Sequence, residues 1–341
     1  MKKILIIHTG GTFGMIPVDS GVTLAPGNIQ DQILQSVPEV GKIARIETVM
    51  PFNIDSSNIT LEHWKWLAEY IVKSRQKFDG FVIIHGTDTM AYTASALSFM
   101  LLHSPKPIIL TGSQRPLSKI RTDARNNLIN AVELASLGIP EVCIFFGNRL
   151  FRGNRTTKVS TWWFDAFESP NFRPLAEVGF DIDLNLPSYS RRKFQPFFNL
   201  DPSVGVVKVF PGCINEYLDR MLHSSLKAII VEGYGSGTFQ VEGENFLSFI
   251  NSSIEMGKLV AINTQSYHGG VFPELYQSGK RALEAGALSC QDMTMETCIV
   301  KMMYLLGKHE KDLEEAKRRY TLDIAGELSS TRHRFQDTFE V

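Results

Sequence analysis

The residues of this chain that could do chemistry are hydroxyl-bearing side chains next to glycines in two short segments. The first glycine segment is Thr9-Gly10-Gly11-Thr12, and the second is His85-Gly86-Thr87-Asp88-Thr89. Glycines let a backbone approach a ligand closely and expose its N–H groups, so either segment can present a threonine hydroxyl to a substrate. An alcohol is a weak nucleophile at neutral pH, however, and needs a base beside it.

Both glycine segments also have a simpler structural interpretation. The first can be a tight turn in which Thr12 caps the following segment, and Thr87, Asp88 and Thr89 can cap a helix that begins at Met90. Three such residues exceed the needs of one cap, and a carboxylate beside a hydroxyl suits a substrate that carries an amino group. The residues alone leave both interpretations open.

Further polar groups could complete such a site. A lysine whose pKa is lowered by partial burial can act as a base, and Lys158 in residues 152–158 is the candidate, unless this stretch is a solvated basic loop. The cluster Asp55-Ser56-Ser57-Asn58 could bind a carboxylate or form only a turn and cap. His8 and His85 each end an expected strand, and we interpret them as hydrogen-bonded residues rather than catalytic bases.

Motifs of other chemistries are missing from the sequence. The four cysteines form no C-x-x-C pair, there is no H-E-x-x-H, and the histidines do not cluster, so we expect reduced thiols and no metal site. A P-loop, a G-x-S-x-G elbow and a dinucleotide-binding glycine spacing are likewise missing, so a P-loop NTPase, an α/β-hydrolase and a dinucleotide-binding protein are not supported.

Short apolar runs precede the polar segments, and helix-like stretches separate the runs. Continuous apolar runs of this length are typical of strands buried on both faces of a parallel sheet. We expect strands over residues 3–7, 81–84, 107–110, 142–146, 204–210, 228–231 and 259–262, and helices over 61–74, 90–102, 123–137, 295–306 and 311–319. In a doubly wound α/β fold ligands bind at the carboxyl ends of the strands, where the polar segments lie.

Length and charge set the domain organisation and the class of partner. The chain has 341 residues, and we expect a larger N-terminal doubly wound α/β domain (1–190) with a mostly parallel sheet, and a smaller C-terminal α/β domain (204–341). A proline-containing linker at about 191–203 would join them. The net charge of -1 disfavours nucleic-acid binding, and no apolar run approaches the roughly 20 residues that span a bilayer. Because too few apolar residues follow Met1 for a secretory signal, we expect a cytoplasmic protein.

Taken together, these residues resemble the bacterial-type L-asparaginases, most closely the cytosolic type I group. The resemblance runs nearly end to end and rests most specifically on the two glycine segments in this order. It is also carried by Asp55-Ser56-Ser57, Thr111-Gly112-Ser113-Gln114, residues 152–158, Phe164-Asp165-Ala166-Phe167, Ser169-Pro170-Asn171 and Tyr234-Gly235-Ser236-Gly237.

The resemblance implies hydrolysis of L-asparagine to L-aspartate and ammonia, without metal or coenzyme. It implies that Thr12 is the covalent nucleophile and that Thr87, Asp88 and Lys158 complete the catalytic set. Asp88 would also bind the substrate α-ammonium, and Asp55, Ser56 and Ser57 its α-carboxylate. The remaining residues expected beside the substrate are Gly11, Gly86 and Ser113. A homodimer or a dimer of dimers is implied as well.

Several positions depart from familiar members of that family. Val22 stands where many have a tyrosine on a flexible loop, and Thr238 where many have asparagine. Some type I enzymes have a second, regulatory asparagine site that includes a cysteine; here Ser266 stands at that position and Glu232 where an arginine might stand. Because a glutamate repels a carboxylate, we expect weak or absent cooperativity. Residues 14–28 could be a mobile lid or an ordinary surface loop.

Two other functions remain open at this stage. One is a related amidohydrolase that uses glutamine more broadly or supplies ammonia to a partner. That subgroup carries an added N-terminal domain, and the first strand expected here begins at Lys3, which argues against it. The other is a non-catalytic amino-acid-binding protein on the same fold, which would have no need of Thr12.

Overall fold

The chain forms two compact units. The computed structural model describes residues 1–18, 21–24, 33, 35–189, 192–241 and 245–329, without the side chains of 15–18 and 21–24. The first unit holds Met1–Ser169 and Arg173–Phe198, and the second holds Pro170–Phe172 and the residues from Asn199 onward. The domain limits expected from the sequence, 1–190 and 204–341, remain a prediction.

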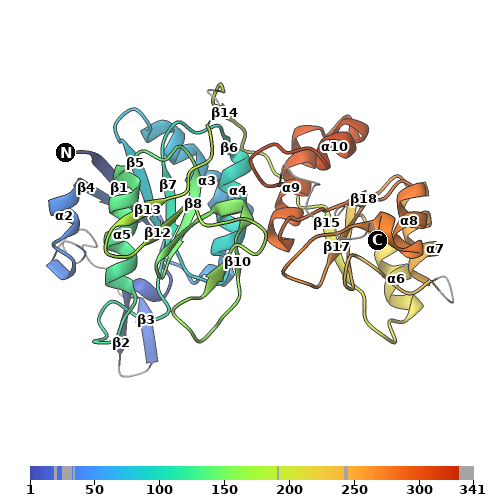
Figure 1. Cartoon of the computed structure of the whole chain (residues 1–341), viewed down its shortest axis with the longest axis horizontal. Coiled ribbons are helices and arrows are strands. Elements are labelled where there is room, and N and C mark those ends of the chain that lie inside the picture. The colour runs from blue at the N-terminus through green and yellow to red at the C-terminus, as the bar shows by residue number, and fades with distance from the viewer. Residues whose placement is uncertain (19–20, 25–32, 34, 190–191, 242–244, 330–341) are drawn as a thin grey trace, which may run out of the picture. The chain divides into compact units, whose positions relative to one another are not determined.

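An eight-stranded sheet forms the core of the first unit (Figure 1). Five neighbouring strands run parallel, in the order β4 (Arg45–Val49), β1 (Lys3–His8), β5 (Gly80–Ile84), β7 (Ile108–Thr111) and β8 (Val142–Phe146). The sheet then continues antiparallel through β9 (Arg149–Arg152), β12 (Ala176–Val178) and β13 (Ile182–Leu184). Every residue of β5, β7 and β8 is buried, which explains why these strands read as continuous apolar runs.

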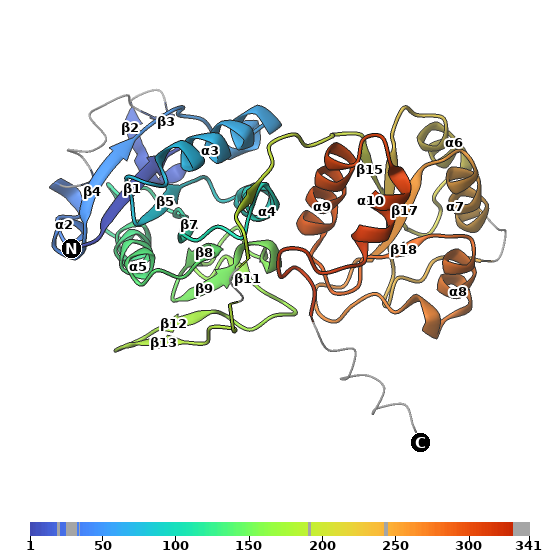
Figure 2. The same ribbon diagram turned by 90° about the horizontal axis from the view of Figure 1, so that it is seen from above.

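Helices cover both faces of this sheet. Figure 2 shows α3 (Leu61–Ser74) and α4 (Met90–Met100) on one side, and α2 (Val40–Ile43) and α5 (Ala124–Ser136) on the other. The doubly wound arrangement expected from the sequence is therefore confirmed. The helix expected over 90–102 ends at Met100, because β6 (Leu101–Leu102) pairs with β14 (Gln195–Pro196). The stretch interpreted as linker thus contributes a short strand to the first unit.

The first unit also contains a hairpin after Thr12. Strand β2 (Met15–Val18) pairs antiparallel with β3 (Gly21–Leu24), and Pro17 lies opposite Val22. Residues 19–20 and 25–28 of the expected lid lie outside the described residues, so the lid remains a prediction.

The second unit is a smaller α/β fold. Its sheet has four parallel strands, β15 (Val204–Lys208), β16 (Ala228–Gly233), β17 (Leu259–Thr264) and β18 (Leu288–Ser289). The helices are α6 (Asn215–Leu222), α7 (Asn245–Glu255), α8 (Gln277–Glu284), α9 (Met295–Lys308) and α10 (Leu313–Tyr320). The α/β class and the mostly parallel N-terminal sheet are both confirmed. Among the described residues, no helix is long and apolar enough to cross a membrane.

Candidate active site

The two glycine segments meet at the ends of neighbouring parallel strands. Strand β1 ends at His8 and β5 at Ile84, and these two residues are partners in the sheet. A Cβ atom placed on Gly11 would lie 2.5 Å from Gly86 Cα, so the two backbones are in direct contact. Thr12 and Thr87 are the residues that follow these glycines. The contact therefore brings both hydroxyl-bearing residues to the same edge of the sheet.

We expect Gly11→Ala to destabilise the protein far more than Gly138→Ala. Both glycines have a φ of +79°, but a Cβ on Gly138 would meet nothing within 4 Å. The left-handed backbone alone costs a non-glycine residue about 1–3 kcal/mol, which both variants share. Urea unfolding of the two variants therefore isolates the cost of separating Gly11 from Gly86, and equal losses would show that this contact is unimportant.

The third polar cluster is joined to both glycine segments. Gly10 bridges to Ile54, the residue before Asp55, and a Cβ on Gly86 would lie 2.6 Å from Ser56 Oγ. Thr89 lies at the N-cap position of α4 without capping it; its hydroxyl donates instead to the carbonyl of Ser56, 2.7 Å away. The cap interpretation of Thr89 is therefore wrong, because its side chain holds the neighbouring segment.

Asp55 caps a turn, which is one of the two roles that the sequence left open for its segment. Its Oδ1 accepts hydrogen bonds from the backbone N–H and the hydroxyl of Ser57, each 2.8 Å away, at the start of the 3₁₀ turn Ser56–Asn58. These hydrogen bonds from Ser57 hold the pKa of Asp55 below its ordinary value. Ser56 is buried and Ser57 exposed, so the cluster offers one shielded and one accessible hydroxyl.

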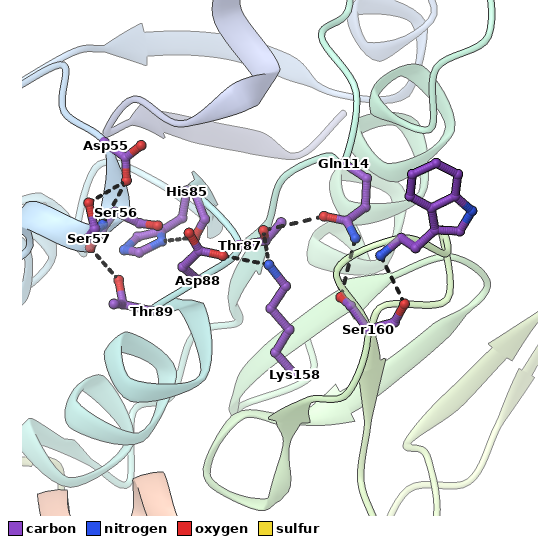
Figure 3. Close-up of polar contacts among 12 residues, drawn as sticks. Asp55, Ser56, Ser57, His85, Thr87, Asp88, Thr89, Gln114, Lys158 and Ser160 are labelled. Carbon is purple, nitrogen blue, oxygen red and sulfur yellow. Dashed lines mark hydrogen bonds and ion pairs between the residues drawn. The ribbon is translucent and has the colours of Figure 1, made fainter.

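Lys158 reaches this edge from another part of the unit. It lies in β10 (Thr157–Lys158), which pairs antiparallel with β11 (Phe167–Glu168). Its Nζ donates to Thr87 Oγ1 at 2.8 Å and to Asp88 Oδ1 at 2.6 Å (Figure 3). The Lys158 side chain is only 15% exposed, whereas that of Asp88 is 64% exposed. The interpretation of this stretch as a solvated basic loop is therefore wrong, and the lysine points at a predicted catalytic threonine.

His85 and His8 behave as hydrogen-bonded strand-end residues. His85 Nδ1 lies 2.7 Å from the carbonyl of Gly86 and must donate to it, so Nε2 is left to accept from Thr93 Oγ1 at 3.0 Å. His8 Nδ1 accepts from the backbone N–H of Gly10 at 3.2 Å. Burial lowers the pKa of each imidazole to about 4. Both rings are therefore neutral at pH 7, and each makes a hydrogen bond to the backbone of its own glycine segment.

The end of β7 adds two polar residues to the same edge. A Cβ on Gly112 would lie 2.2 Å from the carbonyl oxygen of His85, and Ser113 and Gln114 follow directly. The buried Ser113 hydroxyl has no hydrogen-bond partner among the residues that the structure describes. Gln114 belongs to the segment Thr111-Gly112-Ser113-Gln114 but is not among the expected site residues, yet Thr87 Oγ1 donates to its Oε1 at 3.5 Å. Its position three residues beyond the end of β7 predicts the edge of the sheet where it lies but not its contacts.

Three residues that depart from the family pattern lie in the second unit, and each has a local contact there. Glu232 forms an ion pair with Lys208 at 3.2 Å, and the backbone N–H of Ser266 donates to Thr264 Oγ1. Thr238 Oγ1 donates to the carbonyl of Tyr234. Because Lys208 offsets the charge of Glu232, the repulsion argument is weakened, and low cooperativity remains a prediction. Across the described ranges, no three His, Cys, Asp or Glu residues are grouped to hold a metal ion.

Comparisons with known proteins agree with this architecture. The family model "Asparaginase, N-terminal" matches residues 3–189, and "Glutaminase/Asparaginase C-terminal domain" matches residues 203–319. L-asparaginase 1 of Escherichia coli K12 is 39% identical over 335 residues, which cover 96% of this chain and 98% of that protein.

Solved structures extend the match to three dimensions. The thermostable L-asparaginase from Thermococcus kodakarensis superposes with a TM-score of 0.89 at 35% identity, over 96% of this chain and 100% of that one. L-asparaginase I from Vibrio cholerae gives a TM-score of 0.87 at 36% identity, over 96% and 99% of the two chains. Since the family models cover both units and the relatives span nearly the whole length, this chain belongs to the asparaginase family.

Proposed function

We propose that this protein hydrolyses the side-chain amide of L-asparagine to give L-aspartate and ammonia. One observation carries the proposal: Lys158 Nζ contacts both Thr87 and Asp88, beside the backbone contact that brings in Thr12. A hydroxyl, an amine and a carboxylate within hydrogen-bond distance form a set that can move a proton during acyl transfer. The relatives named above are L-asparaginases, which supports asparagine as the substrate.

In the proposed reaction Thr12 Oγ1 attacks the amide carbon of the substrate side chain. Lys158, as the neutral amine once its own proton has passed to Asp88, accepts the hydroxyl proton by way of Thr87. It returns this proton to the nitrogen as the C–N bond breaks, and the nitrogen leaves as ammonia. Water then attacks the resulting ester, releases aspartate and restores the Thr12 hydroxyl. Backbone N–H groups near Gly11 and Thr87 would stabilise the oxyanion, each donor contributing about 3–4 kcal/mol.

The rest of the expected site would bind the substrate α-carbon groups. The exposed Asp88 carboxylate can take the α-ammonium. Ser56 can donate its hydroxyl to the α-carboxylate, and Ser57 can do so once its hydroxyl turns away from Asp55. Gly86 and Ser113 would flank the substrate. A minor glutaminase activity is part of the proposal, since one extra methylene changes binding by only about 1–3 kcal/mol. We also propose a cytoplasmic homodimer or dimer of dimers, as the family resemblance implies.

A coupled ammonia assay with asparagine, with glutamine and without substrate tests this function. We expect steady ammonia release from asparagine, slower release from glutamine and none in the blank. Calorimetry with asparagine completes the test. Binding without ammonia release would identify an amino-acid-binding protein instead, and faster release from glutamine than from asparagine would favour the broader amidohydrolase.

A further inference from the structure

We propose that Gln114 is a positioning residue that orients the Thr87 hydroxyl and couples it to the aromatic segment, residues 160–164. The aromatic segment is Ser160-Thr161-Trp162-Trp163-Phe164, and it begins two residues after Lys158. The role of Thr87 in this argument rests on the proposed function. The contacts of the Gln114 amide do not depend on that function.

The orientation of the Gln114 amide is fixed by the aromatic segment. Its nitrogen Nε2 lies 3.3 Å from the carbonyl oxygen of Ser160 (Figure 3). It also lies 3.1 Å from the carbonyl oxygen of Trp163. Both partners are acceptors, so a flipped amide would set its own oxygen against two carbonyl oxygens. The NH₂ group must therefore face the aromatic segment, and Oε1 must face Thr87.

The amide in turn determines the direction of the Thr87 hydroxyl. Thr87 Oγ1 accepts a hydrogen bond from Lys158 Nζ at 2.8 Å, and an ammonium group can only donate. The single hydroxyl proton must then point to another acceptor, and Gln114 Oε1 lies 3.5 Å away. Because this bond is long, it biases the rotation of the hydroxyl without binding its proton tightly. The Thr87 hydroxyl is therefore oriented between its donor, Lys158 Nζ, and its acceptor, Gln114 Oε1.

Both ends of this connection are anchored. The backbone N–H of Gln114 donates to both carboxylate oxygens of the buried Asp123, at 2.9 and 3.1 Å. On the other side, Ser160 Oγ accepts from the backbone N–H groups of Trp162 and Trp163. A shift of the aromatic segment would therefore be transmitted to Thr87 through one amide side chain.

The aromatic segment also supplies a spectroscopic reporter. Of the four tryptophans, Trp162 and Trp163 are 82% and 70% exposed, whereas Trp66 is half-buried and Trp64 is buried. Quenching of tryptophan fluorescence by acrylamide therefore reports mainly on this segment. It requires no substrate, so it is independent of whether the proposed function is correct.

The test compares Gln114→Met with the exposed control Gln76→Met. Methionine removes both the acceptor and the donor at similar volume, so we expect kcat with asparagine to fall about 10- to 100-fold, KM to change less, and tryptophan quenching to increase. Gln76→Met should change none of these. Gln114→Glu keeps an acceptor for Thr87 but loses the donor, so we expect it to increase quenching as well.

Each outcome decides the proposal. Normal kcat in a folded Gln114→Met would overturn the proposal that Gln114 orients the Thr87 hydroxyl. If quenching increased while kcat stayed normal, Gln114 would only tether the aromatic segment, and the proposal would be overturned as well. If Gln114→Met does not fold, Gln114→Ala, which also removes both amide groups, takes its place, and normal kcat in that variant contradicts the proposal. If the wild-type protein releases no ammonia from asparagine, the proposed function fails, while unchanged quenching would separately refute the tether.

Discussion

Thr12→Ala and Thr87→Ala are each expected to abolish nearly all ammonia release from asparagine while leaving the fold intact. Thr12 is the proposed nucleophile, and losing the covalent route from an enzyme of this type costs about 10³-fold or more. Thr87 is buried and accepts from Lys158, so its loss breaks the path by which the proton is expected to travel. Initial rates from the coupled ammonia assay measure both effects.

Matched variants separate chemistry from folding in this experiment. Thr122 is half-buried; its hydroxyl donates to the carbonyl of Arg115 and accepts from the backbone N–H of Ala124, outside the proposed reaction, so Thr122→Ala should be active. Thr87→Ala and Thr122→Ala each lose local hydrogen bonds worth about 1 kcal/mol apiece, and a thermal melt followed by circular dichroism checks that all three variants stay folded. A near-normal rate in either Thr12→Ala or Thr87→Ala would refute the role assigned to that threonine.

The sequence predicted the part of the fold that depends on burial. Strands β5, β7 and β8 are buried along their whole length, so their apolar runs marked them clearly. Strands β9, β12 and β13 were not predicted, because they are short, partly exposed and paired antiparallel at one side of the sheet. The same holds for β6 and β14, whose pairing joins residues far apart in the chain.

The candidate site was predictable where its residues sit at strand ends, and less so elsewhere. Thr12 and Thr87 follow glycines directly after β1 and β5, which placed them at one edge of a parallel sheet before any contact was known. Lys158 was ambiguous, since a short basic stretch gives no sign of which side chain turns inward. Gln114 was missed because its importance comes from tertiary contacts with Thr87 and Trp163, which no local pattern records.

Lys158→Met is expected to lower kcat by about 10²–10⁴-fold, the range that a general base contributes. Methionine keeps much of the apolar stem but removes the amine that contacts Thr87 and Asp88. The Asp88 side chain is 64% exposed, so leaving it unpaired should cost little stability. Lys3→Met is the control, because Lys3 forms an ion pair of the same length with Glu47 at 2.6 Å, and the Glu47 side chain is likewise exposed, at 52%.

Lys158→Arg distinguishes proton transfer from the simple need for a positive charge. Arginine keeps the charge and can pair with Asp88, but it does not lose a proton in proteins and so cannot act as a base. If Lys158 accepts the proton, the arginine variant should be nearly as slow as Lys158→Met. Substantial activity in Lys158→Arg would instead assign Lys158 an electrostatic role. Full activity in Lys158→Met would remove it from the reaction altogether, and the proton would need another acceptor close to Thr87.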